Sequence, residues 1–197
     1  MFAILAAVTL AAAAHAAPAA EPFEQSLIQI RGEALAAVSV QASLAAKEEI
    51  KKTDKNIQLT ANQAWSGRSN LSNLVARAQV HGSDPMISSD LYRLEQDLDI
   101  YQQNCAVVRK QVVALAAAAV KDPALAADAK KLYEHSRILD SNAGYLAIDA
   151  RNSNSTLAVA GYGGQAYQIQ RLAEAGAELT PDTREAAKVL LDKITKP

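Results

Sequence analysis

Few side chains in this chain of 197 residues are suited to chemistry. It has three histidines and one cysteine, namely His15, His81, His135 and Cys105. A metal site needs such groups at ligand spacing, and a di-iron bundle needs Glu-x-x-His motifs on facing helices. No such motif is present, because Glu134 and His135 are adjacent and would point about 100° apart on a helix. The sequence therefore predicts no metal and no cofactor.

Cys105 is the only cysteine, so no disulfide can form within the chain. It has no Cys-x-x-Cys partner for redox chemistry. We expect a small buried hydrophobic residue at this position. An intermolecular disulfide or a redox-active thiol is the alternative.

Aromatic residues beside helix-breaking glycines are the one unusual feature. Tyr145, Tyr162 and Tyr167 lie around the segment Gly161–Gly164, and Trp65 lies at a similar interruption. Aromatic residues at a helix break can line a groove for a ligand or a partner. They can also close the end of a bundle, where a tyrosine keeps its hydroxyl in water. These four aromatic residues form the candidate binding site.

Catalytic motifs are absent. The sequence contains neither a phosphate-binding Gly-x-x-x-x-Gly-Lys loop nor a Gly-x-Ser-x-Gly elbow. Glu95, Asp97 and Asp99 would lie on different faces of a helix, which suits solubility better than acid/base catalysis. These absences favour a protein that is not an enzyme without deciding it, and no catalytic residue is assigned.

The charge balance bears on the partners. With 20 basic and 21 acidic residues, the net charge is -1. A nucleic-acid-binding protein would show a basic face, so nucleic acid is not an expected partner.

The elements that carry these residues are predicted to be helices. Hydrophobic residues make up 50% of the chain, much of it alanine, and only 8 Gly and 6 Pro interrupt it. Alanine is the best helix former, and so few turn residues do not suit a β-sandwich. The predicted fold class is all-α, an antiparallel bundle of about four long helices with short connecting helices.

The first helix is expected over residues 24–64, where apolar residues recur at steps of three, four and seven. The segment Trp65–Asn70 is expected to interrupt it, with a shorter helix over 70–80. A tight stop and restart is expected at Asp122 and Pro123. Because that connection is short, the helix after it should run back antiparallel on the helix before it.

A strict heptad seam is the clearest pattern, and Ser88 or Ser89 is expected to cap its helix. Its apolar positions alternate three and four residues apart, which indicates left-handed helix packing. They are Leu91, Leu94, Leu98, Tyr101, Cys105, Val108, Val112, Leu115 and Ala119. The seam could pair within the chain or between chains, and the sequence leaves both open.

The C-terminal part of the chain is expected to hold two shorter helices. Gly161–Gly164 should break the preceding helix, and the first shorter helix covers about residues 165–175. Thr180 is expected to cap the second.

The first residues resemble a targeting segment. Residues 1–20 carry no charge, and the apolar run ends in Ala14-His15-Ala16, a small-x-small pattern that signal peptidase reads. We expect a signal peptide at 1–16, an extended leader at 17–23 and one helical-bundle domain at 24–197. No Lys or Arg precedes the apolar run, so the signal is atypical or the start site lies upstream. An uncleaved membrane anchor is the alternative.

These patterns favour a non-enzymatic protein exported to the bacterial periplasm or secreted. It would act as a binding, interaction or envelope structural module. The expected partners are another envelope protein or a second copy paired through the heptad seam, and no membrane-spanning segment should remain after cleavage. The alternative is an enzyme or a carrier of a small molecule, metal or cofactor, with its site near Gly161–Gly164.

Overall fold

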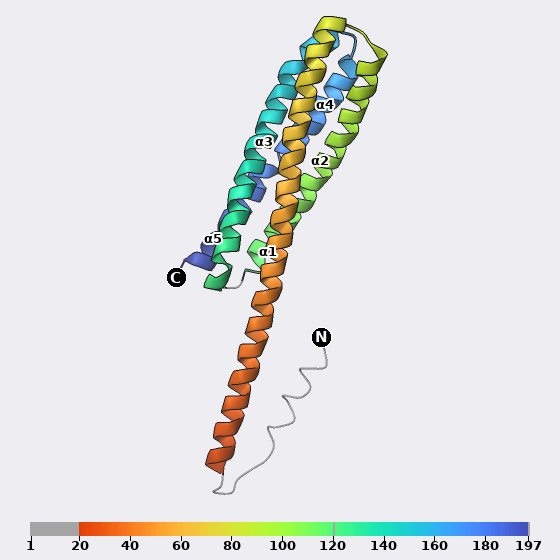
Figure 1. Cartoon of the computed structure of the whole chain (residues 1–197). Helices are drawn as coiled ribbons and strands as arrows, with labels where there is room; N and C mark the ends of the chain where they lie inside the picture. Colours follow the sequence, from red (N-terminus) through yellow and green to blue (C-terminus); the bar gives the residue numbers. More distant parts are fainter. Residues whose placement is uncertain (1–19, 120, 197) are drawn as a thin grey trace. The chain divides into compact units, whose positions relative to one another are not determined.

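The computed structural model describes residues 20–119 and 121–196, and over these residues it is helical without strands (Figure 1). The chain divides into two compact units, Met1–Ala42 and Ser43–Pro197. The helices are α1 (Ala20–His81), α2 (Pro85–Ala117), the 3-10 helix η1 (Pro123–Leu125), α3 (Ala126–Val159), α4 (Gly163–Ala177) and α5 (Thr180–Thr195). The expected signal peptide (1–16) and residues 17–19 of the leader lie outside the described residues. Residues 20–23 of that leader belong to α1.

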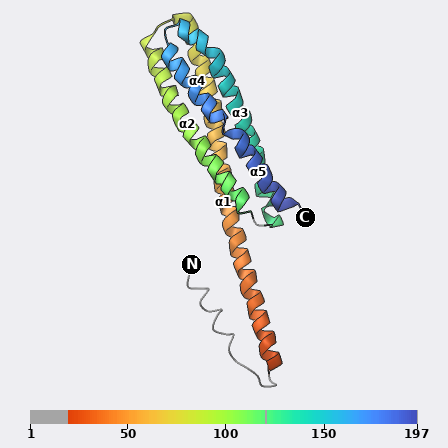
Figure 2. The ribbon, with the colours of Figure 1, turned by 180° about the vertical axis from the view of Figure 1, so that it is seen from behind.

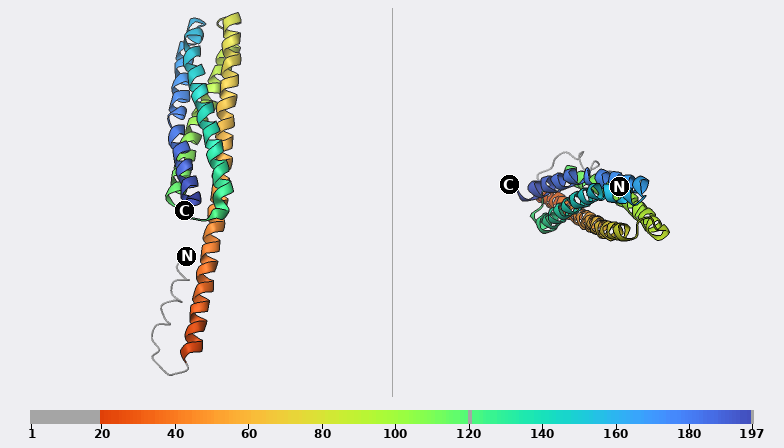
Figure 3. Two further views of the ribbon diagram at one scale, coloured as in Figure 1. Left: turned by 90° about the vertical axis from the view of Figure 1, so that its left-hand side faces the viewer. Right: turned by 90° about the horizontal axis from the view of Figure 1, so that it is seen from above.

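The second unit is an all-α bundle of four long packed helices. Its first two are α1 from Ser43 onward and α2, the third is α3, and α4 followed by α5 forms the fourth. Figure 2 shows α4 and α5 end to end, packed against both α2 and α3. α1 and α3 run in one direction, and α2, α4 and α5 run in the other (Figure 3).

Polar contacts fix the parallel register of α1 and α3. Asp54 meets His135, the Ala61 carbonyl accepts from Asn142, and Arg68 pairs with Asp149. Each contact joins residues 81 positions apart, so a polar contact between α1 and α3 recurs at every seventh residue. A constant offset is the mark of two parallel helices whose heptads stay in phase.

α1 and α2 are antiparallel with an equally regular register. Side-chain amides join Asn56 to Gln111 and Gln63 to Asn104. Further along, Arg77 binds Asp90. From one contact to the next, the residue number rises by seven or fourteen on α1 and falls by the same number on α2. α1 therefore carries one polar seam toward α2 and another toward α3.

The expected packing of α3 on α2 is wrong. The two helices are antiparallel, but α3 packs on α4 and α5, and α2 packs on the same two helices. α2 and α3 thus lie diagonally across the bundle. The connection through Asp122 reverses the chain as expected, but η1 gives it enough length to cross to the diagonal position.

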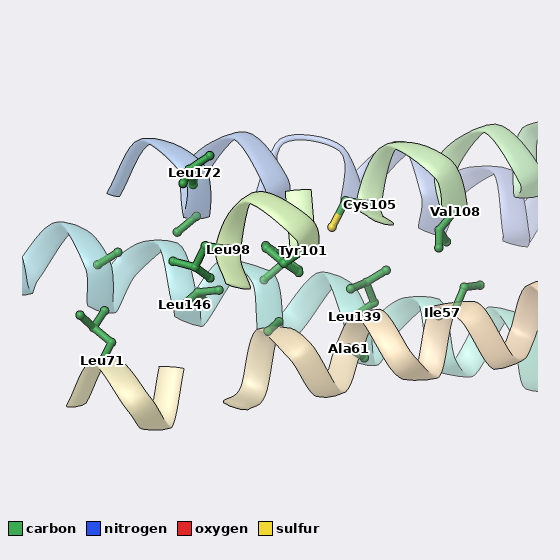
Figure 4. Close-up of a cluster of buried hydrophobic side chains, with 14 of the residues drawn as sticks. Ile57, Ala61, Leu71, Leu98, Tyr101, Cys105, Val108, Leu139, Leu146 and Leu172 are labelled. Carbon is green, nitrogen blue, oxygen red and sulfur yellow. The ribbon is translucent and has the colours of Figure 1, made fainter. Parts of the chain in front are cut away.

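The heptad seam of α2 lies in the core of the bundle. Its first seven members, from Leu91 to Val112, are buried, as is Ala116. Leu115 and Ala119 are only partly buried. The buried position moves from 115 to 116 because a straight helix of 3.6 residues per turn drifts against a 3.5-residue repeat. Figure 4 shows part of this core, with Leu98, Tyr101 and Cys105 on α2.

The expected interruption at Trp65–Asn70 is wrong, because α1 is continuous through it. Gly67 is buried in the helix interior, and a Cβ there would lie 3.1 Å from Cδ2 of Leu98. Glycine costs a helix about 1 kcal/mol relative to alanine. The close approach of Leu98 and Leu146 offsets that cost, which a pattern of helix propensity alone does not reveal.

The caps differ from the expectation at two helices. α2 begins earlier than Ser88, with Asp84 accepting from the backbone N–H of Met86. Leu179 is the N-cap residue of α5, and the Thr180 hydroxyl binds Asp140 instead of capping the helix. The expected cap at Asp122 is confirmed, since its carboxylate accepts from the N–H of Ala124.

Candidate functional site

Tyr162 does not belong to an open site. It is 5% exposed and lies at the end of the bundle where both hairpins turn. Its hydroxyl accepts from the N–H of Asp84 at 2.5 Å and lies within donating distance of the carbonyls of Gly82 and Asp84. Gly82 and Gly161, the turn residues of the two hairpins, both have positive φ, which glycine adopts without strain. Tyr162 therefore ties the two turns together.

Trp65 and Tyr145 share one exposed surface. They are 61% and 52% exposed and lie on α1 and α3. The Arg68 guanidinium lies 5.1 Å from the ring centroid of Tyr145 and also binds Asp149 at 2.5 Å. Trp65 comes one turn before Arg68, and Tyr145 one turn before Asp149. Because these two turns are paired, Trp65 and Tyr145 lie at the same level of the bundle.

Two isoleucines missed by the sequence analysis extend this surface. Ile138 and Ile148 are each about half exposed on α3. They stand with Tyr145 at helical steps of seven and three, beside the buried seam that holds Leu139 and Leu146. This second apolar stripe is the sequence pattern from which the two isoleucines could have been predicted. We call the surface formed by Trp65, Ile138, Tyr145 and Ile148 the α1–α3 face.

Tyr167 lies elsewhere. It is an exposed residue on α4, in the first half of that helix. Nearby on α4, Glu174 binds Arg151 of α3, which lowers the pKa of the Glu174 carboxyl. The structure thus separates the four candidate residues. Trp65 and Tyr145 lie on the α1–α3 face, Tyr162 is buried between the two turns, and Tyr167 lies apart on α4.

The two histidines in the described part of the chain, His81 and His135, are not brought together. His135 binds Asp54 at 2.7 Å, whereas His81 is exposed at the end of α1. Asp54 and His81 are 27 residues apart on one straight element, and at 1.5 Å per residue this is about 40 Å. The described residues contain no group of three or more His, Cys, Asp or Glu side chains that could hold a metal ion.

The centre of the bundle holds a polar group without a partner. The Tyr101 hydroxyl is buried and makes no regular hydrogen bond among the described residues, and its polar neighbour is the weakly bonding Cys105 thiol on the same helix. Burial is the main cause that raises the pKa of Tyr101 and raises that of Cys105 to about 12. Both groups therefore stay protonated at neutral pH, so the Cys105 thiol is a poor nucleophile.

The surface grooves are shallow. One of about 370 Å³ runs between α1 and α2, with Leu59 and Ile100 at its edges and Gly67 in its lining. Its other lining residues are mostly uncharged amides and hydroxyls. Another, near the break at Gly161–Gly164, is lined by small residues, Gln79 and Val159, and holds no charged group. Neither combines a deep apolar pocket with converging polar groups, as small-molecule sites do.

The comparisons with known proteins give no further lead. No known protein family, characterised protein or solved structure shows significant similarity to the chain. In the described part of the chain, no helix is both long and apolar enough to cross a membrane.

Proposed function

We propose that this protein is an exported, non-enzymatic helical bundle that binds a protein partner through the α1–α3 face. The observation that carries the proposal is this cluster of two aromatic and two aliphatic side chains, each at least half exposed. Such side chains supply most of the binding energy at protein interfaces when they are desolvated, and tryptophan and tyrosine are enriched there.

The framework under this face is suited to binding without rearrangement. The face stands on two long helices held in register by the Asp54–His135 and Arg68–Asp149 pairs. Side chains displayed on helices with fixed partners lose less freedom on binding than side chains on loops. Because Arg68 and His135 beside the face already have acidic partners, an apolar partner surface can approach without leaving these two groups unpaired.

Export is proposed from the sequence. The uncharged segment up to Ala20 and the small-x-small pattern at Ala14–Ala16 support a secretory signal, and the single cysteine is compatible with an oxidising compartment. In the bacterial periplasm, the partner would be another envelope protein or a second copy of this chain.

Site-specific crosslinking tests the interaction. A photoreactive phenylalanine analogue replaces Tyr145 in one variant and Val113, an exposed residue of α2, in a matched control. With the protein at its natural level in its source organism, irradiation should give discrete adducts from position 145 and none from position 113. Adducts of equal yield from both positions, or none from position 145, would contradict a dedicated binding face.

A further inference from the structure

The exposed stripe of α3 is complementary to itself when it is reversed. It contains Ile138, Ser141, Tyr145 and Ile148, at steps of three, four and three, and all four are exposed. If a second copy lies antiparallel across it, centred near Ala143, Ile138 of each copy faces Ile148 of the other. Ser141 then faces Tyr145, so a small side chain lies opposite a large one on both sides of the centre.

We propose that the partner of the α1–α3 face is a second copy of this chain, bound antiparallel about a two-fold axis near Ala143. This inference rests on the proposed function and names its partner. A two-fold interface uses the same patch on both subunits, so a stripe that matches its own reverse satisfies the main geometric requirement. Antiparallel helices also pack large against small side chains in alternating layers.

The position of Trp65 agrees with this axis. In the constant register of α1 and α3, Trp65 lies level with Leu146, which is three residues from Ala143. The axis therefore brings each Trp65 to the level of Asp140 in the second copy, about 4.5 Å along the helix from the centre. The four large side chains of the α1–α3 face then lie within five residues on either side of the axis.

The exposed area indicates the size of the contact. With aromatic side chains of 150–250 Å², about half exposed, the face offers roughly 500 Å² per copy, or about 1,000 Å² in the pair. This is near the lower limit for a specific interface, so we expect a dissociation constant on the order of micromolar. The flanking charges add no repulsion at the α1 side, since Arg68 and His135 each have an acidic partner within the chain.

Cysteine crosslinking of the purified full chain tests both the dimer and its direction. Ile138→Cys and Ile148→Cys are oxidised separately and as an equimolar mixture. The antiparallel register brings position 138 of one copy against position 148 of the other, while identical positions are about 15 Å apart along the axis. The mixture should therefore form a disulfide dimer several-fold faster than either variant alone. Wild type, whose Cys105 is buried, and Val113→Cys are the controls.

Sedimentation gives a second measurement that does not depend on cysteine. Wild type should show a monomer–dimer equilibrium, and Ile148→Glu should abolish it while the helical circular dichroism is unchanged. Rapid crosslinking between two Ile148→Cys chains would show that the two copies lie parallel and would contradict the antiparallel arrangement. A wild-type monomer at all soluble concentrations would overturn the self-association. If position 145 still gave discrete photo-adducts with a different protein, the proposed function would stand without this inference, and if it gave none, both would fail.

Discussion

The ring of Tyr101 on α2 lies directly against the backbone of Gly176 on α4. A Cβ added at position 176 would fall far inside contact distance of the ring, 3.0 Å from Cζ and closer still to Cε1. Both residues are buried, so neither can move toward solvent to relieve the overlap. The glycine gives α4 the close approach that a large aromatic side chain in the centre requires.

Replacement of Gly176 by alanine should destabilise the protein by about 2 kcal/mol or more, because overpacking forces side chains off their rotamers. Urea unfolding followed by circular dichroism measures the change. Gly144→Ala is the matched control, since nothing lies within 4 Å of a Cβ there. That control should gain up to about 1 kcal/mol from helix propensity. A neutral Gly176→Ala variant would show that the helices are not so close.

The unpartnered hydroxyl of Tyr101 predicts a stabilising substitution. Tyr101→Phe removes a buried polar group and keeps the ring against Gly176. An unsatisfied buried group costs about 1–3 kcal/mol, so the variant should be more stable by about 1 kcal/mol in the same urea assay. Tyr92→Phe, on the exposed side of α2, should change nothing. A less stable Tyr101→Phe would mean that a water or the neighbouring Cys105 thiol binds the hydroxyl.

Cys105 predicts a loss of stability at alkaline pH. Burial raises the pKa of its thiol from 9.0 to about 12. As the pH rises, the thiol therefore loses its proton in the unfolded chain before it does so in the folded protein. Its contribution to the free energy of unfolding is complete below about pH 9 and is lost as the pH rises toward 12. The melting temperature should fall over this range by less in Cys105→Ala than in wild type. Equal falls in the two proteins would contradict the shift.

The same burial predicts that Cys105 does not react with thiol reagents in the folded protein. At pH 8 the group is a protonated, inaccessible thiol, so labelling should require urea. Val113→Cys, on the exposed side of α2, should take up one equivalent without urea. Labelling of wild type in the absence of urea would show that the core opens.

Leu98 tests the seam of α2. A carboxylate at this buried position has no partner, so Leu98→Asp should unfold the protein. Ile100→Asp, two residues away and half exposed, should change the stability by no more than about 0.5 kcal/mol. Thermal melts of the two variants give the comparison. A Leu98→Asp variant with the wild-type melting temperature would refute the assignment.

The proposed signal segment predicts a processed protein. Expression of the full chain in a bacterium should give a periplasmic form whose first residue is Ala17, as read by N-terminal sequencing. Replacing Ala14 and Ala16 by large residues should block processing, because the peptidase accepts small side chains at these positions. Recovery of an unprocessed wild type in the membrane fraction would favour the anchor.

Periodicity predicted the buried residues of α2 well, because the requirement for burial repeats along the helix. Leu91 through Val112 were placed correctly from spacing alone. The neighbours of that seam could not be predicted in the same way. Leu98 is 3.1 Å from the position of a Cβ on Gly67, a residue that by propensity alone marks a helix break. Spacing along one helix does not show which other helix fills the groove beside it.

The grouping of the four aromatic residues could be predicted only in part, for a related reason. Trp65 and Tyr145 lie together because the register of α1 and α3 pairs Arg68 with Asp149, and that register is a tertiary property. Tyr162 was predicted at a break, which is correct, but its hydroxyl is bound by the facing turn at Asp84. A single sequence shows that an aromatic residue lies near a turn and does not show whether another turn covers it.

The polar contacts between the helices recur at every seventh residue, so the bundle could change in length by whole heptads. The contacts of Asp54, Ala61 and Arg68 with α3 recur every seven residues, and the same step relates the contacts of α1 with α2. Deleting one heptad from each of the four long helices would shorten the bundle by about 10 Å and leave every remaining polar contact in register. A deletion that is not a multiple of seven residues would turn the α1–α3 face away from its orientation. Natural variation in length among related chains should therefore come in multiples of seven, distributed over all four helices at once.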